Sequence, residues 1–200
     1  MSHNIGVYGS SVSEGPKAEA PGKALGLALA KHGCTVITGA CSGMPYIVAY
    51  EAARHGSEVW GFSPALNAEE QRRAYPHDDI SIYTRLIYVP RNYHELFIKP
   101  PASAEQDWSE RLKYRNVIST INSDAGIIIS GSWGTLNEFT NLIYEGKPIG
   151  VLTGSGGLAD RLPDWFPRLR KKSDSVVIFE NEPEKLVERM IAELEKGNLG

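Results

Sequence analysis

Residues 125–138 read AGIIISGSWGTLNE and join an apolar run to a glycine-rich turn and a helix start. Ala125 to Ile129 carry no polar side chain, which is typical of a strand buried on both faces of a sheet. Thr135 to Tyr144 then follows a helical pattern. A buried strand that leads through a glycine-rich turn into a helix is one half of a βαβ unit. This stretch therefore predicts a parallel α/β fold.

The same alternation of short apolar runs and helical stretches extends in both directions from this stretch. Further strands are expected at 4–9, 34–38, 57–62, 84–89, 148–152 and 176–179, and further helices at 17–32, 44–55, 105–122, 158–172 and 183–196. Asn67 to Asp79 is polar, contains a proline and is expected to be an insertion loop. We predict a single domain, residues 1–200, with a doubly wound, Rossmann-like parallel sheet flanked by helices.

Composition and charge limit the class of protein. Of the 200 residues 42% are hydrophobic and 22% charged, which is typical of a globular chain. A net charge of −3 gives no positive field, so neither nucleic acid nor a membrane surface is expected as a partner. No apolar run approaches the ~20 residues of a membrane helix, and the first residues do not resemble a secretion signal. Two cysteines and five scattered histidines favour a cytoplasmic protein without a metal or other cofactor.

Three loops follow expected strands and are rich in glycine and hydroxyl side chains. The residues that we expect to bind a phosphate or a nucleotide are Gly9, Ser10, Ser11, Gly39, Ser42, Gly43, Met44, Gly131, Ser132, Gly134 and Thr135. Glycine allows close approach of a ligand to the backbone, and the N-terminus of a helix offers free N–H groups. Each loop alone is better explained by ordinary turn and capping chemistry, but three at one edge of a sheet indicate an anion site.

Other nucleotide-binding motifs are absent from the sequence. The chain lacks the G-x-x-x-x-G-K-[ST] pattern of a triphosphate-binding loop. It also lacks G-x-G-x-x-G after the first strand, and no acidic residue follows the second strand to hold a ribose. A nucleoside monophosphate or a related phosphorylated small molecule is therefore the expected ligand.

Glu138 and Arg115 each allow a functional and a structural interpretation. Thr135 to Glu138 match the T-x-x-E capping box, in which Glu138 would only bond the start of the helix. Alternatively, the Glu138 carboxylate lies at the phosphate site and takes part in catalysis. Arg115 borders an expected buried stripe formed by Tyr114, Val117, Ile118 and Ile121, so it either reaches water or an acidic neighbour, or enters the ligand site.

Taken together, these motifs resemble the Lonely Guy family, often described as lysine decarboxylase-like. The family motif P-G-G-x-G-T-x-x-E corresponds to residues 130–138, which read SGSWGTLNE, and the arginine of a preceding Arg-Lys pair corresponds to Arg115. The loops at 9–11 and 39–44 resemble the other family loops, and the likeness extends over residues 4–180.

This resemblance implies a function for the site. Lonely Guy enzymes are phosphoribohydrolases that cleave the N-glycosidic bond of N6-substituted adenosine 5′-monophosphates to free base and ribose 5-phosphate. By this resemblance Arg115 and Glu138 are the catalytic residues, and the protein is a homodimer or a higher homo-oligomer formed through helices beside the cleft. No lysine context for pyridoxal phosphate is found, so the decarboxylase label has no support.

Three departures from the family pattern keep a second interpretation open. Ser130 stands for the motif proline, Ser132 for its middle glycine, and Asn116 for the lysine that follows the arginine. A Cβ at Ser132 could narrow the loop. The alternative function is a non-catalytic binding or carrier protein of the same superfamily, similar to the molybdenum-cofactor carrier proteins.

Overall fold

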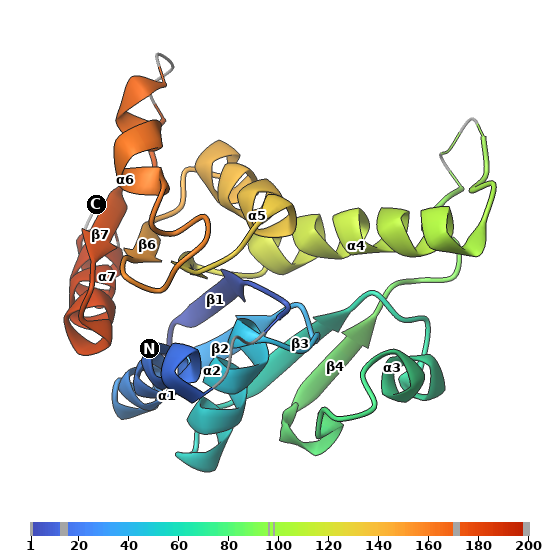
Figure 1. Ribbon diagram of the computed structural model, residues 1–200, viewed down its shortest axis with the longest axis horizontal. Helices are drawn as coiled ribbons and strands as arrows, with labels where there is room; N and C mark the ends of the chain where they lie inside the picture. Colours follow the sequence, from blue (N-terminus) through green and yellow to red (C-terminus); the bar gives the residue numbers. More distant parts are fainter. Residues whose placement is uncertain (1, 13–15, 96, 98, 170–172, 198–200) are drawn as a thin grey trace.

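A seven-stranded parallel sheet forms the centre of the structure (Figure 1), a computed structural model that describes residues 2–12, 16–95, 97, 99–169 and 173–197. The strands are β1 (Asn4–Gly9), β2 (Thr35–Thr38), β3 (Val59–Ser63), β4 (Arg85–Tyr88), β5 (Ala125–Ile129), β6 (Ile149–Leu152) and β7 (Val177–Glu180), in the order β4-β3-β2-β1-β5-β6-β7. The order reverses at β1, which pairs in parallel with both β2 and β5. This arrangement confirms the predicted doubly wound α/β fold.

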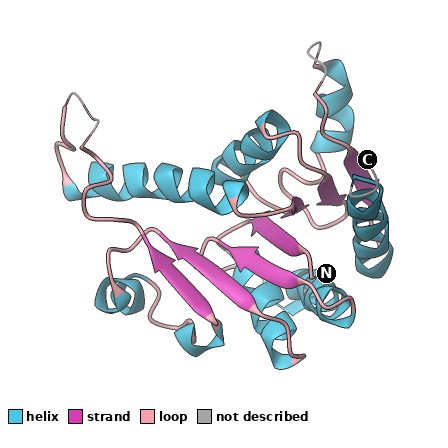
Figure 2. Cartoon of the chain, turned by 180° about the vertical axis from the view of Figure 1, so that it is seen from behind, coloured by secondary structure: helices cyan, strands magenta, loops and turns pink. Residues whose placement is uncertain are grey.

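Helices cover both faces of the sheet, as Figure 2 shows from the opposite side. They are α1 (Pro16–Lys31), α2 (Met44–Arg54), α3 (Ala68–Ala74), α4 (Ala104–Ile121), α5 (Trp133–Tyr144), α6 (Leu162–Trp165) and α7 (Pro183–Gly197), with short 3-10 helices η1 (Ile80–Ile82) and η2 (Phe166–Arg168). α1 packs against α2 and α7, whereas α4 packs against α5. Alternate residues of β1 therefore enter different cores: Ile5 and Val7 lie in one, and Tyr8 lies in the other. No helix of the described ranges is long and apolar enough to span a membrane.

Two predictions about secondary structure are wrong. The expected insertion loop at 67–79 contains helix α3, whose N-cap Asn67 accepts a hydrogen bond from the Glu70 backbone N–H at 2.9 Å. The sequence Asn67-Ala-Glu-Glu70 is a capping signal that predicts this helix start. The single helix expected at 158–172 is replaced by α6 and η2, because Pro167 removes a backbone donor; residues 170–172 lie outside the described part of the chain.

The contact between α1 and α2 requires a small residue at one position. A Cβ added to Gly26 of α1 would collide with the backbone oxygen of Val48 in α2. A Cβ added to Gly22, one turn earlier, would lie 3.1 Å from the flexible end of Met44. The two glycines lie in the same helix, but an added methyl group would meet rigid backbone at Gly26 and a flexible side chain at Gly22.

We predict that Gly26→Ala lowers the free energy of unfolding by about 1–3 kcal/mol, because overpacking outweighs the gain in helix propensity. The matched control Gly22→Ala should be neutral or stabilising. Urea denaturation followed by circular dichroism measures both. Equal stability of the two variants would contradict the proposed close contact.

Candidate functional site

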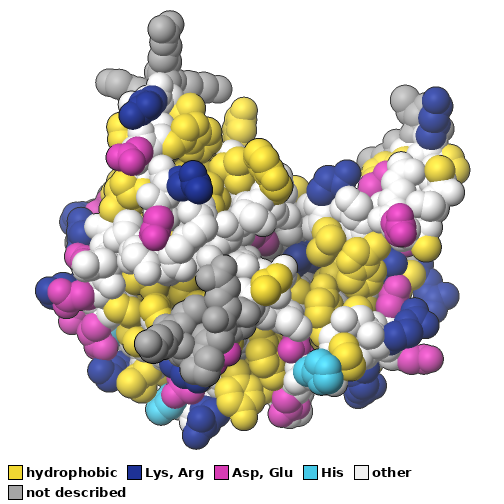
Figure 3. All heavy atoms as spheres, viewed as in Figure 1, with side chains coloured by type: hydrophobic (Ala, Val, Ile, Leu, Met, Phe, Trp, Pro, Cys, Tyr) yellow, Lys and Arg dark blue, Asp and Glu magenta, His cyan; other side chains and the backbone are white. Residues whose placement is uncertain are grey.

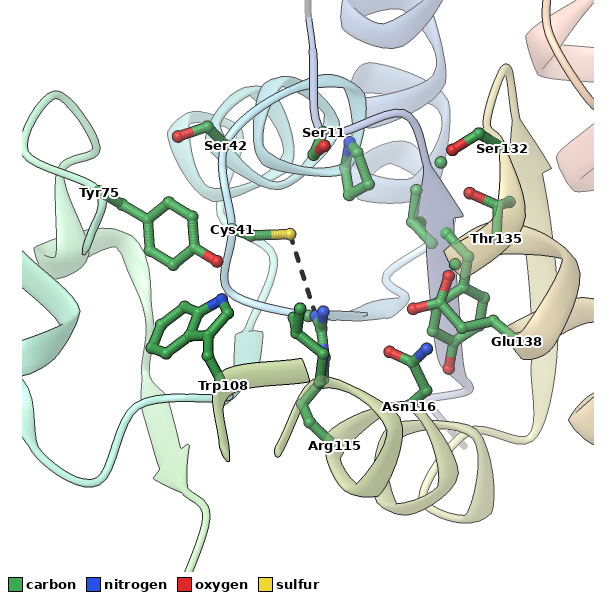
Figure 4. A pocket seen from close by; sticks show the side chains of 17 residues that line it. Ser11, Cys41, Ser42, Tyr75, Trp108, Arg115, Asn116, Ser132, Thr135 and Glu138 are labelled. Carbon is green, nitrogen blue, oxygen red and sulfur yellow. Dashed lines mark hydrogen bonds between the residues drawn. The ribbon is translucent and has the colours of Figure 1, made fainter. Parts of the chain in front are cut away.

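The three predicted loops lie next to each other, because β2, β1 and β5 are neighbours in the sheet. They border a cavity of about 520 Å³ at the carboxyl ends of these strands, where the sheet order reverses. Figure 4 shows side chains from the loops, from α4 and from α5 around this space. The cavity is lined by Val7, Tyr8, Gly9, Ser11, Gly39, Cys41, Ser42, Pro45, Tyr75, Trp108, Leu112, Arg115, Asn116, Ser132, Gly134, Thr135 and Glu138.

Most of the residues predicted for the site line this cavity, and four do not. The lining contains Gly9, Ser11, Gly39, Ser42, Arg115, Ser132, Gly134, Thr135 and Glu138, whereas Ser10, Gly43, Met44 and Gly131 lie outside it. The Ser10 carbonyl accepts a hydrogen bond from the Met44 N–H at 2.8 Å, which ties the first loop to the second. Met44 is buried in the core. Gly43 and Gly131 have φ values of 94° and 103°, so these two positions favour glycine for the turn itself.

Glu138 faces the cavity rather than the start of its helix (Figure 4). α5 begins at Trp133 with Ser132 as N-cap, so Thr135 lies within the helix and the capping-box interpretation is wrong. The Glu138 side chain is only 6% exposed, and no hydrogen-bond partner is found for it among the described residues. Burial raises the pKa of Glu138 to about 7, and the positive charge of Arg115 opposes part of that shift. This carboxyl can therefore exchange a proton near neutral pH.

Arg115 also enters the cavity, so the interpretation as a surface residue is wrong. The side chain is 6% exposed and lies against Gly39, where any Cβ would collide with the guanidinium. Arg115 Nη1 contacts Cys41 Sγ at 3.9 Å, and Nε is buried without a partner in the described structure. Arg115 and Glu138 form no ion pair, although each affects the pKa of the other. The pocket thus presents a cation and a weak acid that lack strong protein partners.

The buried face of α4 differs from the predicted one. Its buried residues are Arg111, Arg115, Asn116, Ser119 and Thr120. Of the apolar residues expected to be buried, Val117 is 42% exposed and Ile121 is 56% exposed. The polar side chains turn inward because α4 lines the cavity and because protein groups bond many of them, for example Ser119 Oγ to the Asn116 carbonyl at 3.0 Å.

Asn116 places a free acceptor beside Arg115 and Glu138. Its Nδ2 donates to Asn137 Oδ1 at 3.0 Å, which holds the amide in one orientation. Its Oδ1 is buried and has no partner among the residues described. Where the Lonely Guy pattern has a lysine cation, this chain therefore offers a carbonyl oxygen that accepts from an N–H or O–H group. Ser132, another departure, has φ −142°, a negative value that tolerates a Cβ.

The sequence analysis did not predict Tyr75 and Trp108, which form the opposite side of the cavity (Figure 4). Their ring centroids are 6.3 Å apart. Trp108 lies seven residues before Arg115, which is two helical turns and the same face, so helical spacing could have found it. Tyr75 ends α3, the helix that was taken for a loop, and carries no comparable signal.

One group of potential metal ligands occurs in the described ranges, outside the cavity. Ligand atoms of His32, Glu184 and Glu188 lie within 4.8 Å of one another, and all three residues are exposed. Neighbouring acidic side chains at a surface are common without a metal ion. The expectation that the protein needs no metal stays a prediction.

Comparison with known structures gives the same fold. TM1055, a structural genomics target, is 20% identical with a TM-score of 0.70, and the alignment covers 98% of this chain and 99% of that one. The molybdenum cofactor binding protein of Rippkaea orientalis is 18% identical, with a TM-score of 0.67 and coverage of 97% and 98%. DNA processing protein A of Helicobacter pylori, described for its single-stranded DNA binding mode, is 14% identical, with a TM-score of 0.65 and coverage of 96% and 81%.

These identities are low enough that the likeness shows the fold and not a shared ligand. Because structural neighbours include a DNA-binding protein, the expectation that this chain does not bind nucleic acid stays a prediction. A search of curated proteins with this sequence gave no match. The sequence matches the SLOG cluster4 family over residues 2–96 and 109–187. Since these segments make up most of the chain and contain both Arg115 and Glu138, the protein belongs to the SLOG cluster4 family, within the superfamily that the resemblance to Lonely Guy proteins predicted.

Proposed function

We propose that the protein is a phosphoribohydrolase, which binds a nucleoside 5′-monophosphate of the AMP type and hydrolyses its N-glycosidic bond. The products are the free base and ribose 5-phosphate. The observation that carries this proposal is the buried Glu138 carboxyl, which faces the cavity, has a pKa of about 7 and lies on the same lining as Arg115. Two free cysteines, Cys34 and Cys41, fit a reducing cytoplasm as the setting.

The first turn of α5 provides the phosphate site. Its backbone N–H groups have no partner within the helix, and Ser132 gives no side-chain cap hydrogen bond. Gly134 and Thr135 line the cavity at this helix end, and Ser11 lies across from them on the loop after β1. A phosphate there anchors the ribose so that its anomeric carbon faces Glu138.

The chemistry fits a carboxyl with this pKa. The bond between C1′ and the base nitrogen breaks, the base leaves with the electron pair, and positive charge develops on the ribose ring. The ionised form of Glu138 stabilises this charge and takes a proton from the water whose oxygen bonds to C1′. Glu138 then passes the proton that it took from the water to the departing base nitrogen, directly or through solvent, so that atoms and charge balance and the carboxylate is restored. The positive charge of Arg115 favours the ionised form of Glu138. Asn116 Oδ1 accepts a hydrogen bond from a ribose hydroxyl.

The second candidate is a carrier that binds a phosphorylated cofactor without cleaving it. Two observations favour it: the departures at Ser130, Ser132 and Asn116, and the structural neighbours named as molybdenum cofactor binding and carrier proteins. Both functions use the same phosphate loops. They differ in the role of Glu138: the hydrolase needs its carboxyl for bond cleavage, whereas the carrier does not.

Replacing Glu138 by glutamine should reduce release of free base from AMP or N6-substituted AMP at least 100-fold, because the group that accepts a proton is lost. Nucleotide affinity should stay within about threefold, since the phosphate contacts remain. Chromatography of the products and calorimetric titration measure the two quantities. Glu188→Gln, an exposed carboxyl on α7, is the control. Equal turnover in wild type and Glu138→Gln would contradict the catalytic role, and nucleotide binding without turnover in the wild type would favour the carrier.

The raised pKa of Glu138 also predicts how stability depends on pH. The folded state holds its proton up to a pKa of about 7, whereas the unfolded chain loses it at about 4.5, so folding binds a proton between these values. Stability should therefore fall as pH rises from 4.5 to 8, by about 3 kcal/mol for this group alone. Urea titrations of wild type and Glu138→Gln should show this difference, with Glu188→Gln following the wild type. Parallel pH profiles for wild type and Glu138→Gln would refute the assigned pKa.

We further propose a homodimer through the outer side of α4. Val117 and Ile121 expose apolar side chains there, and Tyr114 and Ile118 are partly buried beside them. Figure 3 shows a hollow in the outline of the molecule between the part that carries α6 and the segment before α4, with hydrophobic side chains on the α6 side of the hollow. Burying these apolar side chains against a second copy of the chain is more favourable than exposing them to water.

The double variant Val117→Glu/Ile121→Glu should be a monomer, because four buried charges would face each other across the interface. Sedimentation velocity of wild type and variant measures this. Tyr50→Glu, which adds a charge at a residue of similar exposure on α2, a helix that packs against α1, is the control. A monomeric wild type, or a double variant that stays dimeric, would refute this interface.

A further inference from the structure

Two aromatic side chains on one side of the cavity are held in place by separate sets of contacts with the protein. Tyr75 and Trp108 lie opposite Ser132 and Thr135 at the start of α5. The polar ring atoms of both aromatic residues face the open space (Figure 4). Neither the Tyr75 hydroxyl nor Trp108 Nε1 has a hydrogen-bond partner within the described structure, although both lie beside a polar cavity. The aromatic pair thus presents apolar ring surface together with two unused polar groups.

Trp108 is fixed from behind by a buried arginine. The Arg111 guanidinium lies 5.0 Å from the Trp108 ring centroid and is itself only 4% exposed. It bonds Glu70 at 3.0 Å, Asp107 at 2.9 Å and the Pro64 carbonyl at 2.9 Å. One face of the indole is thus covered by a cation whose two terminal nitrogens are both bonded to protein groups. The ring cannot turn away from the cavity without breaking that stacking.

Tyr75 is fixed by the contacts of α3 with the loop after β2. Gln71 is fully buried; its Nε2 donates to the Ala40 carbonyl at 2.7 Å, and its Oε1 accepts from Ser63 at 2.5 Å. Ser42 donates to Asp78 at 2.9 Å, three residues after Tyr75. The segment that carries Tyr75 is therefore bound to the same loop that borders the phosphate side. Both aromatic rings are built into the cavity wall.

We infer that Tyr75 and Trp108 form the subsite for the ring of the ligand, and that this ring is a planar, fused nitrogen heterocycle linked to a phosphate. The inference rests on the proposed function and specifies which part of the ligand, its ring, the site recognises through these two residues. The face of one aromatic side chain stacks such a ring, while the polar group of the other, whose ring is tilted by 46° from the first, donates to an acceptor at the edge of the ligand ring. The phosphate occupies the other side, at α5. A purine nucleotide has this chemistry, and so does a pterin phosphate.

The test separates the ring from the sugar phosphate. Calorimetric titrations with AMP, neopterin monophosphate and ribose 5-phosphate should be made on wild type, Tyr75→Leu and Trp108→Leu. Each variant should lose affinity for the ring-bearing ligand by about 10-fold or more, the usual effect of removing one stacking partner. Ribose 5-phosphate affinity should stay within twofold. Tyr50→Leu and Trp165→Leu, both partly exposed residues away from the cavity, are the controls.

A fluorescence measurement keeps the inference testable if the leucine variants fold poorly. The chain has four tryptophans, and stacking should quench Trp108. Ligand-induced quenching should occur in wild type and in Trp165→Phe but disappear in Trp108→Phe, which keeps an aromatic ring and most of the affinity. Quenching that persists in Trp108→Phe would refute the ring subsite.

The outcomes distinguish this inference from the proposed function. If AMP binds and is hydrolysed but the aromatic variants lose AMP and ribose 5-phosphate equally, the ring subsite is refuted and the function stands. If neopterin monophosphate binds through the aromatic pair and AMP does not, the ring subsite stands and the nucleotide hydrolase is refuted. Binding of none of the three ligands would overturn both.

Discussion

The buried guanidinium of Arg115 is the constraint from which most of the site follows. A charge that leaves water without a close counter-ion costs several kcal/mol. Among the residues that the structure describes, Arg115 has only the Cys41 sulfur within bonding reach. Gly39 makes room for it, since any side chain there would occupy the same space. The fold thus accepts a cost in stability to keep a cation facing an open cavity. Such a cost is expected where an anionic ligand supplies the missing partner.

The inward turn of the polar face of α4 is a consequence of this arrangement. Arg115 and Asn116 can line the cavity only if α4 presents that face to the loops, which leaves Val117 and Ile121 on the outside. Exposed apolar side chains on one side of a helix and buried polar ones on the other reverse the usual pattern. The cavity accounts for the buried polar half of this reversal, and the proposed interface with a second copy accounts for the exposed apolar half.

The sequence predicted the fold more completely than the site. Apolar strands and glycine-rich turns are local signals, so the strand ends and the three loops were found, and Glu138 and Arg115 followed from spacing within a known motif. The errors have physical causes. α4 was turned the wrong way because hydrophobic periodicity assumes an apolar environment, whereas its inner face borders a polar cavity. Tyr75 was missed because only long-range contacts, such as that of Gln71 with Ala40, bring α3 to the site.

The division of the cavity between separate elements bears on how the site selects its ligand. Glu138 and the proposed phosphate contacts lie on α5 and the strand ends, while Tyr75 caps the end of α3 and Trp108 lies in the first half of α4. Gln71 ties the aromatic side to the loop after β2, and the Arg111–Glu70 pair ties α4 to α3, in both cases without contact with the acid. Under the proposed function, changes in α3 therefore alter the ring that fits and leave the chemistry proposed for Glu138 intact. The proposed ring subsite and the proposed catalytic group thus lie on different parts of this fold, which is one way in which a single fold serves different ligands.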